Sequence, residues 1–273
     1  MTNERGIPEA RVHDAMRLIE KLETEHVLCL EEWVALFAVQ DDLALRAHLF
    51  ERARAVRDKH YGRQVFLRGL IEYSNYCKND CYYCGIRASN ADLRRYRLAL
   101  DEILTCCEQG YDLGYRTFVL QGGEDPKVPL VDIVGALRTR FPDCAITVSA
   151  GELPRKVYQQ LFDAGADRYL LRHETADPHH YGKLHPASMS LEERKACLFA
   201  LRDIGFQVGS GFLVGAPGQT SETMAANLAF LHELDPHMIG IGPFIPHSST
   251  PLASKLAGTM EETLFLLACL RLA

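Results

Sequence analysis

The sequence lacks the features that place a protein in a membrane or on a nucleic acid. Its longest aliphatic run, LFLLACL near the C-terminal end, is far shorter than the ~20 apolar residues that span a bilayer. The opening MTNERGIPEA carries acidic residues and no apolar run, so we expect no signal peptide. The net charge is −6 and like charges do not cluster, which argues against a basic binding surface. We therefore expect a cytoplasmic protein that binds neither nucleic acid nor membrane.

Disulfide chemistry is also disfavoured. The chain has nine cysteines, an odd number, and no secretory signal, so a disulfide framework is not expected. Six of the cysteines are scattered in apolar surroundings, where a thiol most often packs as a small hydrophobic group. The other three, Cys77, Cys81 and Cys84, lie together in YCKNDCYYCGIR with the spacing C-x3-C-x2-C.

The rest of the chain predicts an α/β fold. Residues 8–62 have helical periodicity and suggest an N-terminal helical segment (1–62) ahead of a larger domain (63–273). In that domain, apolar strands alternate with helices, and we expect strands at 65–74, 117–121, 145–149, 168–174, 206–214 and 237–245. Such strands predict a parallel sheet covered by helices.

A barrel is favoured over a nucleotide-binding doubly wound sheet. The segment GSGFLVG (209–215) lacks the third glycine of the dinucleotide fingerprint and lies inside an expected strand. Polar residues instead follow each strand, as they do at the mouth of a TIM-type barrel. The six βα units are fewer than the eight of a full barrel, so we expect either an open six-stranded barrel or a chain without the last two strands.

The three clustered cysteines favour an iron–sulfur cluster. A [4Fe–4S] cube needs a ligand on each of four irons, so three thiolates leave one iron open to a small molecule. The alternative is a structural zinc site with one of the eleven histidines as fourth ligand. Zinc sites, however, usually use paired C-x2–4-C units.

The motif C-x3-C-x2-C, with Tyr83 as the aromatic residue before the last cysteine, resembles the radical S-adenosylmethionine (SAM) superfamily. The resemblance implies that Cys77, Cys81 and Cys84 hold a [4Fe–4S] cluster and that SAM binds its open iron. An electron from the reduced cluster would then split SAM and release a 5′-deoxyadenosyl radical. The protein supplies position and exclusion of solvent, while the cofactors supply the chemistry.

Four longer segments, spread over residues 68–253, resemble the HydE family of [FeFe]-hydrogenase maturases: RGLIEYSNYCKNDCYYCGIR, VLQGGEDP, LLRHETADPHHYGKLHP and GIGPFIPHSSTPLA. The resemblance implies a role in assembling the diiron part of the hydrogenase active site. It implies an organometallic substrate made by a partner maturase, a low-potential electron donor, and a scaffold protein that takes the product. Biotin synthase and methylornithine synthase are nearer relatives within the superfamily than other members.

The resemblance also assigns site residues. SAM would be held by Tyr83, Gln121, Gly122, Gly123, Glu124, Glu174 and Arg194. Glu174 could instead pair with Arg172, and Arg194 could be a solvated surface arginine.

Two arginines, Arg68 and Arg172, are expected inside apolar strands, pointing into the cavity to bind substrate carboxylates. The histidines at 173, 179, 180, 185 and 247 match no metal-site spacing, and most are interpreted as polar loop residues. The adjacent pair His179 and His180 has no assigned role.

Two other functions remain open from the sequence. One is a radical SAM mutase or sulfur-insertion enzyme that acts on a small amino acid, similar to methylornithine synthase or biotin synthase. The other is a zinc-stabilised binding module without enzymatic activity.

Overall fold

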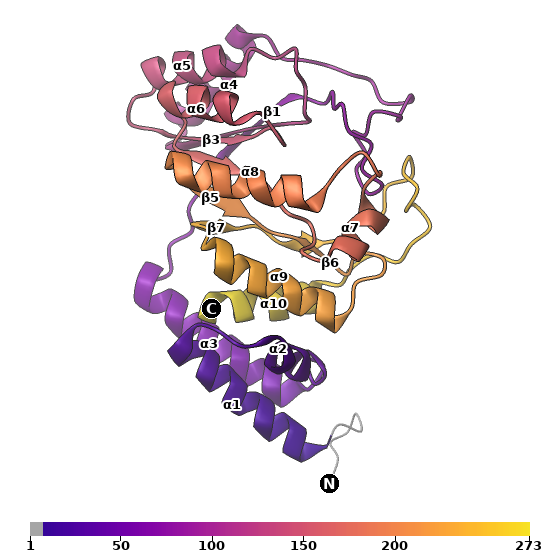
Figure 1. Ribbon diagram of the computed structural model, residues 1–273. Helices are drawn as coiled ribbons and strands as arrows, with labels where there is room; N and C mark the ends of the chain where they lie inside the picture. The colour runs from indigo at the N-terminus through magenta and orange to yellow at the C-terminus, as the bar shows by residue number, and fades with distance from the viewer. Residues whose placement is uncertain (1–7) are drawn as a thin grey trace.

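Six short strands form the centre of the computed structural model, which describes residues 8–273 (Figure 1). All of them run parallel, in the order β1-β2-β3-β4-β5-β7. Their bounds are Gly69–Ser74 (β1), Thr117–Gly122 (β2), Ala145–Ser149 (β3), Arg168–Leu170 (β4), Gln207–Ser210 (β5) and Met238–Ile239 (β7). The predicted parallel sheet is confirmed, and β1 and β7 are its two edges.

Helices follow the strands, as the alternating pattern predicts. They are α4 (Leu100–Asp112), α5 (Leu130–Arg140), α6 (Arg155–Asp163), α7 (Pro178–Leu184), α8 (Leu191–Ile204), α9 (Ser221–Leu234) and α10 (Met260–Leu272). The helix α8 begins after Ser190, whose hydroxyl accepts a hydrogen bond from the Glu193 N–H at 3.3 Å. The same hydroxyl donates to the carboxylate of Glu192.

The last two predicted strands are each divided. The expected strand 206–214 becomes β5 and β6 (Leu213–Val214), and the expected strand 237–245 becomes β7 and β8 (Gly242–Pro243). The strands β6 and β8 pair with each other in a small second sheet. The break falls at Gly211, where a Cβ atom would overlap the Gly240 carbonyl. Only glycine therefore allows these two segments of the chain to approach so closely at this point.

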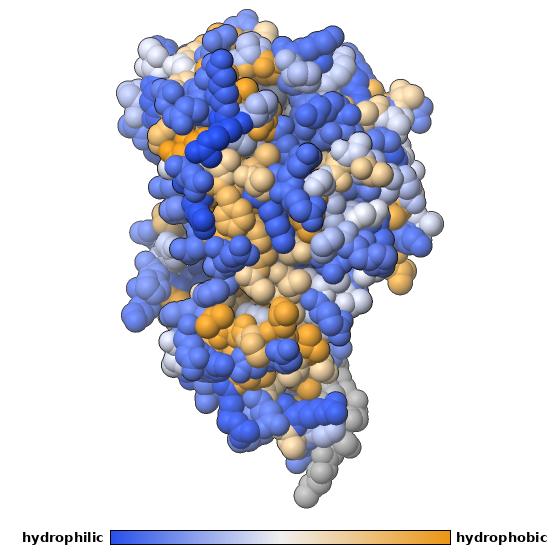
Figure 2. All heavy atoms as spheres, viewed as in Figure 1, coloured by the Kyte–Doolittle hydropathy of each residue, from blue (hydrophilic) through white to orange (hydrophobic). Residues whose placement is uncertain are grey.

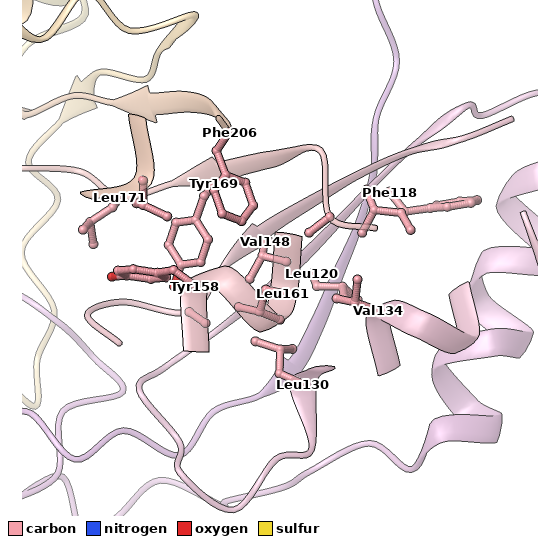
Figure 3. Packing of buried hydrophobic residues seen from close by; sticks show 14 of the residues in the cluster. Phe118, Leu120, Leu130, Val134, Val148, Tyr158, Leu161, Tyr169, Leu171 and Phe206 are labelled. Carbon is pink, nitrogen blue, oxygen red and sulfur yellow. The ribbon is translucent and has the colours of Figure 1, made fainter. Parts of the chain in front are cut away.

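The main core lies between the sheet and helices α4, α5, α6 and α8. On β2, Phe118 and Leu120 alternate with half-buried residues, and the parallel register places them beside Ile146 and Val148 of β3. Figure 3 shows Phe118, Leu120 and Val148 with the buried Leu161 of α6. This face of the sheet is the one that the helices cover, so the alternate residues face the inside of the curved sheet.

A second core joins the N-terminal helices to the C-terminal ones. The helices α1 (Glu9–Glu25), α2 (Leu30–Phe37) and α3 (Leu43–Tyr61) pack against α9 and α10. The helix α3 ends where the sequence predicts, with Gly62 at a φ of 59°. The division into two domains at residue 62 remains a prediction, and residues on both sides of it share this core. Residues 1–7 of the predicted N-terminal segment lie outside the described residues.

Two leucines of α2 test whether this shared core stabilises the whole chain. Leu36 is completely buried, whereas Leu30 is 48% exposed. We expect Leu36→Ala to lower the free energy of unfolding by about 2–5 kcal/mol, because it leaves a cavity, and Leu30→Ala to change it by less than about 0.5 kcal/mol. Urea unfolding would show one shifted transition. A separate early transition in Leu36→Ala would instead indicate an independent N-terminal domain.

The face seen in Figure 2 is largely polar but includes an apolar area. Figure 2 shows that area in the lower half of the view, where the N-terminal helices meet α9 and the end of α10. A hollow there is lined by Val27, Trp33, Leu228 and Ile239, among others. Within residues 8–273, no helix has both the length and the apolar character needed to cross a membrane.

Candidate functional site

The cysteine loop lies at the carboxyl ends of the strands, where a barrel carries its chemistry. It follows β1 and is held from two sides. The Lys78 N–H donates to the Glu124 carbonyl at 3.0 Å, and the Tyr82 N–H donates to the Leu184 carbonyl at 2.9 Å. The loop is therefore fixed between the segment after β2 and the helix α7.

Buried and half-buried polar side chains give the cysteine loop its shape. Arg95 donates to the carbonyls of Ile86 at 2.8 Å and Arg87 at 2.6 Å. The Asp80 carboxylate accepts from the Arg87 side chain at 2.7 Å and from the Ser89 hydroxyl at 2.7 Å. These bonds replace the regular hydrogen bonding of a helix, so the segment is a loop, as its composition predicts.

The three thiols of the cysteine loop are half-buried. Burial, with a contribution from Cys84, raises the pKa of Cys81 to about 12, and burial raises the pKa of Cys84 as well. Among residues 8–273, no three His, Cys, Asp or Glu side chains are grouped as they are around one metal ion. A cubane cluster places each thiolate on a different iron and so suits more widely spaced sulfurs. Zinc would draw its ligands around a single point.

The segment Gly122, Gly123 and Glu124 supports the cysteine loop directly. A Cβ atom on Gly123 would overlap the Tyr76 carbonyl and lie 2.6 Å from the Cys77 Cβ. Only glycine leaves room for the loop at this point. Glu124 is buried, and its Oε1 accepts from the Glu152 N–H at 2.8 Å. The structure thus brings the predicted GGE segment and the cysteines together.

Gln121 and Tyr83 lie on the two sides of this region. Gln121 is the penultimate residue of β2 and sits half-buried beside Ser149 of β3, on the inner face of the sheet. The Tyr83 hydroxyl lies 3.3 Å from the His185 Nε2, and the two rings pack edge to face. His185 thereby holds the aromatic residue of the cysteine motif in place.

Glu174 has an unusual backbone. Its φ is 64°, a left-handed conformation that is strained for a residue other than glycine and is concentrated at functional sites. Its Oε2 lies 3.0 Å from the Arg172 Nη2, as one of the two interpretations of the sequence expects. Neither atom has a hydrogen bond of good geometry, and the Arg172 Nε has none either. Buried polar atoms without partners are costly, so this pair is suited to receive a polar ligand.

Arg194 is buried, not solvated, which excludes the surface interpretation. It is 7% exposed, and its Nε lies 2.6 Å from the Glu152 Oε1. Glu152 is a site residue that sequence reasoning did not identify. The available signal was the segment SAGE (149–152), in which a charged residue follows soon after an apolar strand.

The placement predicted for Arg68 is wrong. Arg68 is exposed and precedes β1, at the end of the strand opposite to the cysteine loop. The strand begins only at Gly69, which pairs with Phe118 of β2, so residues 65–68 have no neighbouring strand. Arg172 lies two residues beyond β4, on the same side of the sheet as the cysteine loop, and is half-buried. Of the two arginines predicted to bind substrate, the structure brings only Arg172 to the site.

The prediction of polar loop histidines is wrong for four of the five. His173, His180 and His185 are buried, and His179 and His180 lie in the helix α7. The His173 Nδ1 lies 2.9 Å from the Ser210 Oγ, whose hydroxyl donates to the Leu171 carbonyl. Because that hydroxyl hydrogen is already used, His173 donates from Nδ1. His180 contacts the Thr175 Oγ1 at 3.0 Å and the Pro217 carbonyl at 3.2 Å. These histidines fix the segment that carries Arg172 and Glu174.

Two of these histidines predict a dependence of stability on pH. Burial, aided by nearby arginines, lowers the pKa of His173 and of His185 to about 3. Both stay neutral in the folded chain, while the unfolded chain binds protons near pH 6.5. Their stabilisation is therefore complete above about pH 6.5 and is lost as the pH falls towards 3.

We expect the free energy of unfolding of the iron-free protein to fall by about 1.4 kcal/mol per pH unit for each of these histidines between pH 6 and 4. His173→Phe should reduce the slope of the free energy of unfolding against pH by the contribution of one histidine. His179→Ala, at an exposed position, should leave that slope unchanged. Urea unfolding at several pH values measures it. Equal slopes for the wild type and His173→Phe would contradict the prediction.

The site can be compared with known proteins. Residues 71–231 match the family described as the Radical SAM superfamily. Over 235 residues, the chain is 44% identical to the [FeFe] hydrogenase maturase subunit HydE of Thermotoga maritima, an alignment that covers 85% of this chain and 67% of that protein. It is 28% identical over 271 residues to the 3-methylornithine synthase of Methanosarcina acetivorans, with 97% of this chain and 76% of that protein covered.

Solved structures agree with this match. The crystal structure of methylornithine synthase superposes with a TM-score of 0.85 at 28% identity, covering 93% of this chain and 76% of that one. The hydrogenase maturase HydG superposes with a TM-score of 0.83 at 24% identity, covering 96% of this chain and 61% of that one, and shares the fold. The predicted radical SAM barrel architecture is confirmed.

Proposed function

The chain belongs to the radical SAM superfamily, and from this premise we propose that it acts as a HydE-type maturase in assembling the diiron site of [FeFe]-hydrogenase. One observation carries the proposal: the C-x3-C-x2-C loop lies on the Gly123–Glu124 segment, close to the buried charges of Glu174 and Arg194. The identity to the HydE relative extends over most of the chain and includes these segments.

The cofactors implied by the family fit the residues present. Cys77, Cys81 and Cys84 would hold three irons of a [4Fe–4S] cluster, with SAM on the fourth iron. When bound, the reduced cluster supplies the electron that splits SAM into methionine and a 5′-deoxyadenosyl radical. A low-potential electron donor must deliver that electron to the cluster.

The chain's own residues would bind and orient SAM. Gly122 and Gly123 let this segment approach Tyr73 and the cysteine loop closely, and the buried Glu124 would offer a carboxylate to the amino group of SAM. Glu174 would accept hydrogen bonds from the ribose, and Arg194 would bind the carboxylate. Tyr83 and Gln121 would lie on either side of the bound SAM. Arg172, whose Nε has no hydrogen-bond partner among residues 8–273 and whose Nη2 lies beside Glu174, would bind a carboxylate of the substrate.

The proposed partners follow from the HydE assignment. The substrate class is a small organometallic iron species with carboxylate groups, made by another maturase. The product would pass to a scaffold protein. The chain spans about two thirds of the length of the HydE relative, so the experiment should include the partner maturases as well as the isolated protein.

Anaerobic reconstitution with iron and sulfide tests the proposal. The protein should turn brown, bind about four irons per chain, and release 5′-deoxyadenosine and methionine from SAM under dithionite. Added to HydE-deficient lysate, it should restore hydrogenase activity. A colourless protein that binds one zinc would contradict the proposal and favour the zinc-stabilised module.

A second function, on a small amino acid, is supported by the superposition on methylornithine synthase. If SAM is cleaved but hydrogenase activity is not restored, the reconstituted protein should be incubated with single amino acids. Formation of 3-methylornithine would then favour a mutase, and insertion of sulfur would favour a biotin synthase-like reaction.

A further inference from the structure

Four charged residues form a continuous chain across the site, with two ion pairs joined by the backbone N–H of Glu152. The Lys78 Nζ, in the cysteine loop, lies 3.1 Å from the Glu124 Oε2. The Glu124 Oε1 accepts from the Glu152 N–H, and the Glu152 Oε1 lies 2.6 Å from the Arg194 Nε. The chain runs from the loop after β1, through the loops after β2 and β3, to the first turn of α8. Glu152 is the link between the cysteine loop and Arg194.

The backbone around Glu152 is rigidly held. Gly151 has a φ of 72°, and a Cβ atom there would lie 2.6 Å from the Glu124 carboxyl carbon, so only glycine fits. The Gly151 carbonyl accepts from the Tyr169 hydroxyl at 2.8 Å and from the Tyr158 hydroxyl at 3.3 Å. Both tyrosines are fully buried. The position of the Glu152 carboxylate therefore depends on the core, and it does not drift with a mobile surface loop.

Arg194 depends on Glu152 for its orientation. The guanidinium is buried, and besides Glu152 it meets the Tyr181 hydroxyl, which is neutral, and the Arg172 carbonyl, 3.5 Å from Nη1. Glu152 engages the guanidinium through Nε, at the edge nearest the arginine stem. A carboxylate ligand can then bind the Nη edge, which is the usual bidentate approach.

We propose that Glu152 is a positioning residue that sets Arg194 to receive the carboxylate of SAM. The inference rests on the proposed function, since it assumes that Arg194 binds SAM. A SAM carboxylate has to reach both the open iron and Arg194. The distance between the cysteine loop and the guanidinium therefore matters, and the Lys78–Glu124–Glu152–Arg194 chain fixes it.

Equilibrium dialysis of SAM against the anaerobically reconstituted, unreduced protein tests this without turnover. We expect Glu152→Ala to weaken SAM binding about tenfold, because the buried guanidinium loses its partner carboxylate and is no longer held in one orientation. Glu152→Gln keeps an oxygen of the same reach and should recover most of that affinity. Glu233→Ala, which removes an exposed acid of α9, should bind SAM as the wild type does.

Decarboxylated SAM separates the proposed role from a general structural one. It has no carboxylate for Arg194, so Glu152→Ala should bind it as the wild type does. In an Arg194→Lys background, Glu152→Ala should cost far less than tenfold in SAM affinity, because contacting residues are coupled. Melting by circular dichroism confirms that each variant is folded.

The outcomes are distinct. Tighter SAM binding by Glu152→Ala would mean that Glu152 competes with the ligand and would overturn the inference. Equal losses for SAM and decarboxylated SAM would also overturn it. If the wild type itself binds no SAM, the proposed function fails and this inference fails with it.

Discussion

Replacing Cys84 by serine abolishes SAM cleavage, which is the largest effect we expect. The thiolate is the only proposed ligand of its iron, and a serine hydroxyl is a poor replacement for a soft sulfur ligand. We expect the rate of 5′-deoxyadenosine release to fall by more than about a thousandfold, into the range of a lost catalytic group. The broad visible absorbance and the bound iron should fall with it.

Cys106→Ser is the matched control for this substitution. Cys106 is an exposed cysteine of α4, on the outer helical layer away from the cysteine loop. It should keep the brown colour, the iron content and the rate of the wild type. If Cys84→Ser kept a full cluster and normal rate while Cys106→Ser lost both, the assignment of the three clustered cysteines would be refuted.

The sequence predicts the layers of this fold well because those features are local. Alternating apolar residues such as Phe118 and Leu120 mark a strand face directly, and the order of strands and helices implies the parallel sheet. The cysteine loop is likewise local, since the spacing of its thiols suffices to predict a cluster. The family model and the superposed structures support both conclusions.

The predictions for Arg68 and His180 fail for two different reasons: strand pairing cannot be inferred from one segment alone, and a local helix signal was missed. The run 65–68 is as apolar as a strand, yet β2 offers it no partner, so Arg68 stays outside the sheet. The helix α7 did have a signal. Asp177 caps it by accepting from the His180 N–H at 2.6 Å, and Pro178 occupies its first turn. Reading DPHH as a helix start would have placed His180 correctly.

Contacts between distant loops could not be predicted at all. The link from Glu152 to Arg194 joins residues on different units, and the left-handed φ of Glu174 depends on the Gly211 carbonyl that holds its N–H. Neither feature follows from periodicity or spacing. Both arise only once the sheet brings the carboxyl ends of its strands together. For this reason Glu174 and Arg194 were assigned to the site through the family resemblance and not from residue spacing.

Gly123→Ala has the second largest expected effect, because it acts on the support of the cysteine loop. Its new methyl group would overlap the Tyr76 carbonyl and meet the Cys77 Cβ at 2.6 Å. Both obstacles belong to or adjoin the backbone, so no flexible side chain can move aside. The loop must shift by a substantial part of an ångström, and with it the first thiol. A misplacement of that size costs about a hundredfold in rate.

The matched control is Gly135→Ala in the helix α5, where a Cβ atom has no neighbour within 4 Å. That substitution should raise stability by about 0.4–1 kcal/mol, because alanine favours the helix, and should leave SAM cleavage unchanged. Iron content separates the two causes of a slow Gly123→Ala enzyme: a severalfold loss of iron means that Cys77 no longer binds, whereas full iron with weak SAM binding means that the GGE segment has moved. Normal rate and normal iron in Gly123→Ala would show that the cysteine loop does not rest on this glycine, and the geometry on which the proposed site depends would then be wrong.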